Sequence, residues 1–195
     1  MSVEALAIPE VLLLTPPRFS DNRGFFSETF SAKREAAAGI AGPFVQDNHS
    51  LSVPRGTVRG LHLQLAPHAQ GKLVRCVRGA IWDVAVDVRH GSPTFGRHVA
   101  AVLSPDNWCQ LWVPAGFLHG FCTLEPETEV IYKVTADYDR ASERGVVWDD
   151  PDLALPWPVE AGKAVLSDKD LVLPRLSDCP AWFTDRGPAG AGPCW

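Results

Sequence analysis

Five polar side chains interrupt apolar stretches of the sequence, and together they have the chemistry to move protons. His62 lies between two leucines, and His119 follows the turn at residues 114–116. Lys72, Asp83 and Tyr132 each lie in a similar apolar stretch. A histidine titrates near neutral pH, and a nearby lysine can stabilise an anionic intermediate. Each of these residues alone is more often structural, so the chemical interpretation requires all five to converge in the fold.

Arg59 is a sixth candidate, but strand periodicity places it away from His62. In a regular strand His62 shares a face with Gly60, and Arg59 falls on the opposite face with the leucines. Either a bulge at Gly60 turns Arg59 toward the histidine, or Arg59 serves a different face.

The apolar stretches are short and are separated by turn residues, which predicts an all-β fold. The 16 glycines and 17 prolines suit short strands joined by turns rather than a helical bundle. One helix is expected from Ser31, a suitable N-cap, to Ala38, with Gly39 beyond its end. Strands are expected at 8–14, 25–30, 58–64, 72–77, 80–88, 98–103, 110–113, 119–124 and 128–135.

The length of 195 residues suits one all-β domain, which we expect over residues 1–183, followed by a disordered tail over 184–195. Recurrent prolines after Asp149 predict an irregular extension. We expect neither a membrane span nor a signal peptide. The net charge of −5 argues against a nucleic-acid partner. Five scattered cysteines without a CxxC pair indicate reduced thiols in a cytoplasmic protein.

The spacing around the histidines resembles the two motifs of metal-binding cupins, a superfamily of β-barrels. Five residues separate Gly56 from His62, and the segment PAGFLH ends in His119. Gln64 stands where these cupins have a second histidine, and Lys72 stands where they have a glutamate. An ammonium group repels a divalent cation, and an amide is a poor substitute for imidazole. The resemblance implies a cupin-type barrel without a metal. With the helix and the extension expected above, the predicted fold is a cupin-type jelly-roll barrel with a short N-terminal helix and an irregular C-terminal extension.

Nine segments, in order, resemble the dTDP-4-dehydrorhamnose 3,5-epimerase family, from Ile8 to Pro174. They are DNRGFFSETF, FVQDNHSLS, VRGLHLQ, QGKLVRCVRG, IWDVAVDVR, SPTFG, QLWVPAGFLHGF, IYKVTADY and LSDKD. This resemblance implies a homodimer that acts on a dTDP-hexose without a metal or other cofactor, and whose N-terminal segment completes the neighbour's site. Leu63 departs from the aromatic residue common at its position.

The resemblance also implies a role for each matching residue. His62 is the base, Tyr132 the acid, and Lys72 lies near the keto oxygen of the substrate. Asp170 orients the base, although Asp168 is close enough to leave that choice open. Phe19 or Phe26 is available to stack on thymine. The expected substrate-binding residues are Arg23, Glu28, Gln46, Asp47, Asn48, Arg59, His119, Glu143 and Lys169.

These residues suit epimerisation at C3 and C5 of a 4-keto-6-deoxyhexose, because a ketone at C4 acidifies both carbons and one base can serve both. The same residues fit a mono-epimerase that acts at C3 or C5 only. A metal-dependent cupin oxygenase is a more distant alternative, against which Gln64 and Lys72 argue. A non-catalytic sugar-nucleotide module would not need His62 or Tyr132.

Overall fold

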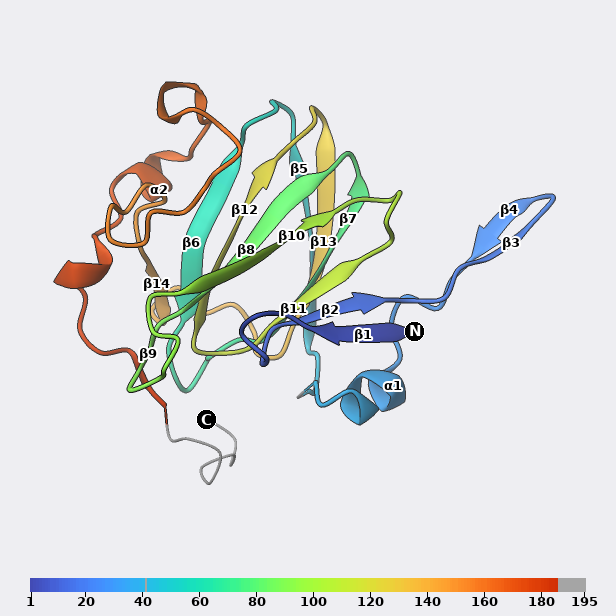
Figure 1. Cartoon of the computed structure of the whole chain (residues 1–195), viewed down its shortest axis with the longest axis horizontal. Coiled ribbons are helices and arrows are strands. Elements are labelled where there is room, and N and C mark those ends of the chain that lie inside the picture. The colour runs from blue at the N-terminus through green and yellow to red at the C-terminus, as the bar shows by residue number, and fades with distance from the viewer. Residues whose placement is uncertain (41, 186–195) are drawn as a thin grey trace.

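The computed structural model describes residues 1–40 and 42–185, most of which lie in or against two antiparallel sheets (Figure 1). The six-stranded sheet has the order β1 (Ser2–Ala5), β2 (Leu12–Thr15), β11 (Gln110–Val113), β7 (Lys72–Arg78), β13 (Thr128–Val134), β5 (Gln46–Ser52). The five-stranded sheet has the order β10 (His98–Leu103), β8 (Ile81–Asp87), β12 (Phe117–Thr123), β6 (Val58–Gln64), β14 (Glu143–Gly145). The predicted all-β, cupin-like jelly roll is confirmed.

The core lies between the two sheets because alternate residues of each strand point inward. Val74 of β7 and Val130 of β13 meet Ile81 and Ala85 of β8 and Phe121 of β12 in one buried cluster. The polar residues singled out in the sequence extend from the same inner faces. The core therefore supplies rigid walls around them.

The C-terminal extension covers the outer face of the five-stranded sheet. It contains η1 (Ala161–Lys163), α2 (Asp168–Leu171), η2 (Leu176–Asp178) and β15 (Phe183–Thr184), which pairs in parallel with β9 (Arg89–His90). In Figure 1 it is the orange-to-red chain that runs beside β6 and β14. Outer-face side chains such as Leu63, Val84 and Leu118 are buried against Trp157 and Trp182. Strands β6, β8 and β12 therefore carry buried apolar side chains on both faces, with the polar residues as exceptions.

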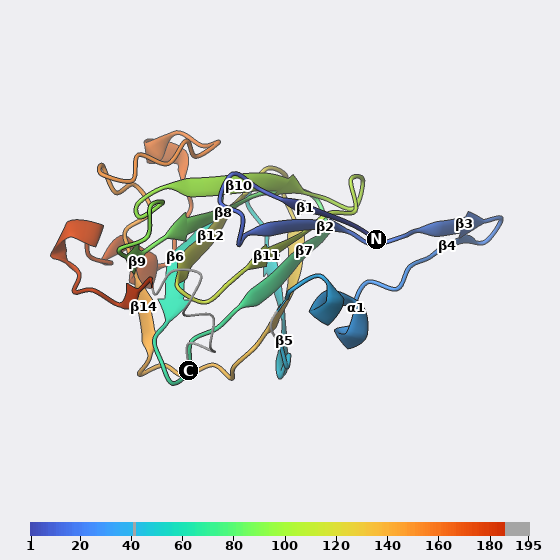
Figure 2. The same ribbon diagram turned by 60° about the horizontal axis from the view of Figure 1, so that its bottom comes forward.

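A hairpin of β3 (Phe19–Asp21) and β4 (Gly24–Phe26) extends away from the two sheets, as Figures 1 and 2 both show. It leaves three large aromatic side chains exposed, those of Phe19, Phe25 and Phe26. Its base is held where Phe25 packs edge-on against Trp108. A protruding apolar hairpin of this kind is typical of a segment that contacts another molecule.

The predicted helix is confirmed as α1 (Ala32–Ala37), but the expected side-chain cap is not formed. Ser31 occupies the N-cap position, and its side chain makes no capping hydrogen bond. Its backbone N–H instead donates to Glu35 Oε2 over 2.9 Å. The helix therefore begins with a bond to the buried side-chain carboxylate of Glu35, and not with one from the side chain of Ser31.

The structure differs from the sequence-based expectations at four other places. The predicted strand at 8–14 is a turn followed by β2, and the one at 25–30 shrinks to β4. Strand β5 was not predicted, because its residues alternate between polar types without an apolar face. Thr184, assigned to a disordered tail over 184–195, pairs with His90, and residues 186–195 of that tail lie outside the described residues. Within residues 1–40 and 42–185, no helix is long and apolar enough to cross a membrane.

Candidate active site

Four of the five polar strand residues line one cavity of ≈ 530 Å³ between the two sheets, and the fifth, Asp83, binds one of them. His62 of β6 and His119 of β12 line it from the five-stranded sheet. Lys72 of β7 and Tyr132 of β13 line it from the six-stranded sheet. Asp83 of β8 lies behind His119 and is fully buried. The convergence on which the chemical interpretation depended is therefore present.

A bulge in β6 at Gly60 turns Arg59 toward this cavity. This is the first of the two alternatives that the sequence left open for Arg59. His62 pairs with His119, but Arg59 pairs with Phe121, so the register shifts by one residue between them. Gly60 has φ +127°, and a Cβ there would lie 2.7 Å from Gly120 Cα. Only glycine tolerates both the backbone angle and this approach. Arg59 and His62 consequently line the same cavity.

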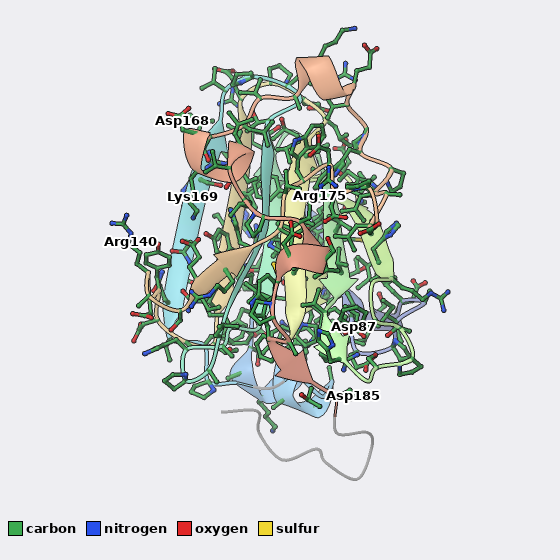
Figure 3. The ribbon with its side chains drawn as sticks, turned by 90° about the vertical axis from the view of Figure 1, so that its left-hand side faces the viewer. Asp87, Arg140, Asp168, Lys169, Arg175 and Asp185 are labelled. Atoms are coloured by element: carbon green, nitrogen blue, oxygen red, sulfur yellow. The ribbon has the colours of Figure 1, made fainter. Side chains whose placement is uncertain are left out.

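His62 is paired with a buried carboxylate of the C-terminal extension. The Nε2–H of His62 donates to Asp170 Oδ1 over 2.7 Å, and Asp170 is 4% exposed. Burial raises the pKa of Asp170, but the hydrogen bond and charge of His62, together with hydrogen bonds from Gly60 and Ser167, outweigh it, and the net pKa lies below the ordinary value. A charged carboxylate accepts, so Nε2 carries the proton in this bond. Asp168 is exposed and lies at the outer edge of the molecule (Figure 3).

A second histidine–aspartate pair lies on the neighbouring strands β12 and β8 of the same sheet, and the sequence analysis gave its carboxylate no role. His119 Nε2 and Asp83 Oδ1 are hydrogen-bonded over 2.6 Å. The other oxygen of Asp83 is buried and has no hydrogen-bond partner among the described residues. The position of Asp83 in the apolar strand β8 marks it as unusual in the sequence. The spacing along the chain does not predict that its partner is His119.

Lys72 and Tyr132 both have pKa values shifted by burial. Desolvation lowers the pKa of Lys72 to about 8, although the carboxylates of Asp83 and Glu143 oppose the shift. Its Nζ donates to the backbone oxygen of His62 over 3.3 Å. Burial also raises the pKa of Tyr132, so its phenol keeps its proton at neutral pH. The cavity thus presents the imidazole of His62, a lysine whose charged form is disfavoured by burial, and a phenol that keeps its proton.

A smaller cavity of ≈ 140 Å³ adjoins the same groups, since His62, Lys72 and Tyr132 line both. Gln46 and Asn48 of β5 and Glu143 of β14 line only the smaller one. Lys169 Nζ donates to Glu143 Oε1 over 2.5 Å, which connects α2 to β14. Burial raises the pKa of Glu143, but Lys169 and Tyr138 outweigh it and lower the net value.

Three of the predicted binding residues lie outside both cavities. Arg23 is at the turn of the protruding hairpin and pairs with Asp21. Glu28 follows the hairpin and pairs with Arg34. Asp47 lies on β5 but pairs with Lys133 of β13. Within this chain these three residues do not approach the catalytic candidates.

The amide at the cupin ligand position is fully engaged in hydrogen bonds with the backbone. Gln64 Nε2 donates to the carbonyl oxygens of His68 and Asp137, and Gln64 Oε1 accepts from the N–H of Asp139. In the part of the chain that the structure describes, no group of three or more His, Cys, Asp or Glu side chains could hold a metal ion.

A jelly roll with paired imidazole and carboxylate, a partly desolvated lysine and a protonated tyrosine around one cavity defines an acid–base enzyme of the cupin-like class. Comparison with known proteins gives its family. A family model described as dTDP-4-dehydrorhamnose 3,5-epimerase matches residues 5–178. The chain belongs to this family.

Individual relatives agree with this assignment. The chain is 54% identical over 185 residues to a dTDP-4-dehydrorhamnose 3,5-epimerase of Sinorhizobium fredii, covering 94% of this chain and 93% of the relative. It is 41% identical to the dTDP-6-deoxy-D-glucose-3,5-epimerase of Legionella pneumophila, solved with dTDP-4-keto-L-rhamnose (TM-score 0.90, 95% and 98% covered). It is 36% identical to a 3'-monoepimerase of Streptomyces bikiniensis, solved with dTDP-quinovose (TM-score 0.82, 88% and 86% covered).

Proposed function

We propose that the protein epimerises dTDP-4-keto-6-deoxy-D-glucose at C3 and C5 to give dTDP-4-keto-L-rhamnose, in dTDP-L-rhamnose biosynthesis. The observation that carries this proposal is the His62–Asp170 pair, which faces Lys72 and Tyr132 across one cavity. The Legionella relative, solved with dTDP-4-keto-L-rhamnose, supports the substrate class. The proposed reaction needs no cofactor and no metal.

In the proposed mechanism His62 is the base. Its Nδ1 takes the proton from C3 or C5, the C–H electron pair forms a C=C bond, and the carbonyl pair moves onto O4. Lys72 stabilises the resulting enolate oxygen, a contribution of about 3–4 kcal/mol to the barrier for one preorganised donor. Asp170 fixes the tautomer of His62 and stabilises the imidazolium. Both carbons share the same oxygen, so the same base serves each in turn.

Tyr132 is the proposed acid because it faces His62 from the other sheet. β13 belongs to the six-stranded sheet and β6 to the five-stranded sheet, so the two side chains approach the cavity from opposite walls. Inversion requires the proton to return on the face opposite to the one it left. The raised pKa of Tyr132 keeps its phenol protonated until it meets the more basic enolate.

Binding of the nucleotide is proposed to involve a second copy of the chain. Arg23 and Phe26 lie on a hairpin that extends away from the cavity of their own chain, which suits a homodimer in which each hairpin completes the neighbour's site. Arg59 is at the cavity and donates to Ser52 Oγ and the carbonyl of Leu51, which leaves it oriented for a diphosphate. Light scattering that gave a monomer mass would contradict the dimer. We propose a cytoplasmic location.

The alternative is a mono-epimerase, favoured by one observation, the likeness to the Streptomyces bikiniensis 3'-monoepimerase. His62, Tyr132 and Lys72 serve either reaction. NMR of the product from dTDP-4-keto-6-deoxy-D-glucose separates the two. We expect inversion at C3 and C5, whereas inversion at one carbon only would establish the mono-epimerase, and unchanged substrate would contradict both.

The activity should decline in alkaline solution because Lys72 loses its charge. Its pKa is lowered to about 8, so the ammonium form predominates below that pH and is lost above it. We expect kcat to fall about tenfold per pH unit above this value. In Lys72→Arg the cation persists, and the alkaline decline should move to higher pH. A pH profile with the same alkaline limb in both proteins would exclude Lys72 as its source.

Asp170 and Asp168 provide a matched pair of substitutions two residues apart. Asp170→Asn removes the charge that faces the imidazolium, and the amide can hold His62 in the wrong tautomer, so kcat should fall about 10²- to 10⁴-fold. Asp168→Asn changes an exposed carboxylate and should leave kcat near the wild-type value. Steady-state kinetics with equal losses in the two variants would refute the assignment of Asp170.

A further inference from the structure

Three glutamine side chains from different parts of the fold bind the backbone of one four-residue segment, Ala136–Asp139. Gln70 Nε2 donates to the carbonyl of Ala136 over 2.7 Å. Gln64 Nε2 donates to the carbonyl of Asp137 over 3.1 Å, and Gln64 Oε1 accepts from the N–H of Asp139 over 2.9 Å. Gln46 Oε1 accepts from the N–H of Tyr138 over 3.0 Å. Every residue of the segment is thus held by a glutamine.

This segment crosses from one sheet to the other at the smaller cavity. It connects β13, which carries Tyr132, with β14, which carries Glu143. Tyr138 and Glu143 line the smaller cavity together with His62, Lys72 and Tyr132. Tyr138 Oη donates to Glu143 Oε2 over 3.1 Å. Tyr138 of this segment therefore forms part of the wall at this end of the reaction space.

Gln64 is the centre of the clamp. It is 4% exposed, and both ends of its amide are used, with an additional bond from Nε2 to the carbonyl of His68 over 2.7 Å. On β6 it lies two residues after His62 and pairs with Glu143 of β14. Its bonds join β6 to the backbone of His68 and of the Ala136–Asp139 segment. An apolar residue of similar size would satisfy the packing but none of these bonds.

We propose that Gln64, assisted by Gln46 and Gln70, is a positioning residue that fixes the Ala136–Asp139 wall against the sugar ring. This inference rests on the proposed epimerase function. A fixed wall keeps Glu143 and Tyr138 in place and limits access of water to the enolate. The enolate is then protonated by Tyr132 on one face instead of by solvent on either. Gln64 therefore acts on the ratio of inversion to unproductive exchange.

The test uses Gln64→Met in the full chain, which preserves length and removes both hydrogen-bonding ends. Amide hydrogen exchange without substrate should show the N–H of Asp139 exchanging about tenfold faster. With dTDP-4-keto-6-deoxyglucose in deuterated water, kcat should fall about 10- to 100-fold. The ratio of deuterated, uninverted substrate to product should rise, and the Kd for dTDP should stay close to wild type. Thr128→Val is the matched control, because it removes a buried bond, from Thr128 Oγ1 to the carbonyl of Glu125, outside both cavities.

Two results would overturn the proposal. One is an unchanged exchange rate at Asp139, which would mean that Gln64 does not hold the segment. The other is faster exchange with wild-type kcat and product ratio, which would mean that the wall plays no part in the reaction. If Gln64→Met fails to fold, Gln70→Met decides by the same readouts, with the N–H of Tyr138 and Asp139 observed together. A wild-type protein that does not convert this sugar overturns the proposed function instead, and the substrate-free exchange still reports on the clamp.

Discussion

His62→Ala is expected to abolish solvent exchange at both C3 and C5 of the substrate, with kcat reduced about 10²- to 10⁴-fold. Asp170 holds the imidazole through Nε2. In the proposed mechanism Nδ1 of that imidazole serves both carbons. Lys72 is a poor substitute for this base, since it is cationic below its pKa of about 8. Deuterium incorporation followed by NMR measures each carbon separately.

The matched control is His90→Ala, which removes an exposed imidazole on β9, away from both cavities. It should exchange and turn over as the wild type does. Binding of dTDP to His62→Ala should persist, because the change does not touch Arg59 or the hairpin. Wild-type exchange at either carbon in His62→Ala would assign the base for that carbon to another residue, with His119 the next candidate in the cavity.

Tyr132→Phe is expected to separate proton removal from inversion. Without the phenol, His62 still takes a proton and returns a solvent-derived one to the same face, so deuterium enters the recovered substrate. Delivery to the opposite face loses its donor, and formation of inverted product should fall about 10²- to 10⁴-fold. The ring is retained, so the packing of Tyr132 against the core cluster changes little.

The control for this variant is internal, because exchange and inversion are measured on the same sample. Exchange at a rate near that of the wild type shows that the variant is folded and binds substrate. Full turnover to inverted product in Tyr132→Phe would place the acid elsewhere. Loss of exchange together with inversion would show that Tyr132 is needed for the first proton transfer as well.

The sequence was informative where a polar residue interrupts an apolar strand. His62, Lys72, Asp83, His119 and Tyr132 were found in this way, because the core forces their neighbours to be apolar and makes each exception visible. The predicted strands at 58–64, 98–103 and 110–113 match β6, β10 and β11, because turn residues mark both ends of these apolar stretches.

Other features depend on contacts between distant parts of the chain, and no local pattern carries them. The choice of Asp170 over Asp168 follows from the way the extension returns to β6. β5 has an alternation of polar residues, so its place beside β13 is set by pairing and not by an apolar face. The sequence shows only that Gln64 replaces a histidine ligand of metal-binding cupins. Its bonds to residues 68, 137 and 139 form only when the loops fold against β6, so the sequence does not predict them.

The most direct test of the central claim is turnover of dTDP-4-keto-6-deoxy-D-glucose by the wild-type protein in deuterated water. If one base acts through an enolate at both carbons, the product carries solvent deuterium at C3 and at C5, both inverted. Inverted product with no solvent deuterium at either carbon would contradict proton abstraction and the role given to His62.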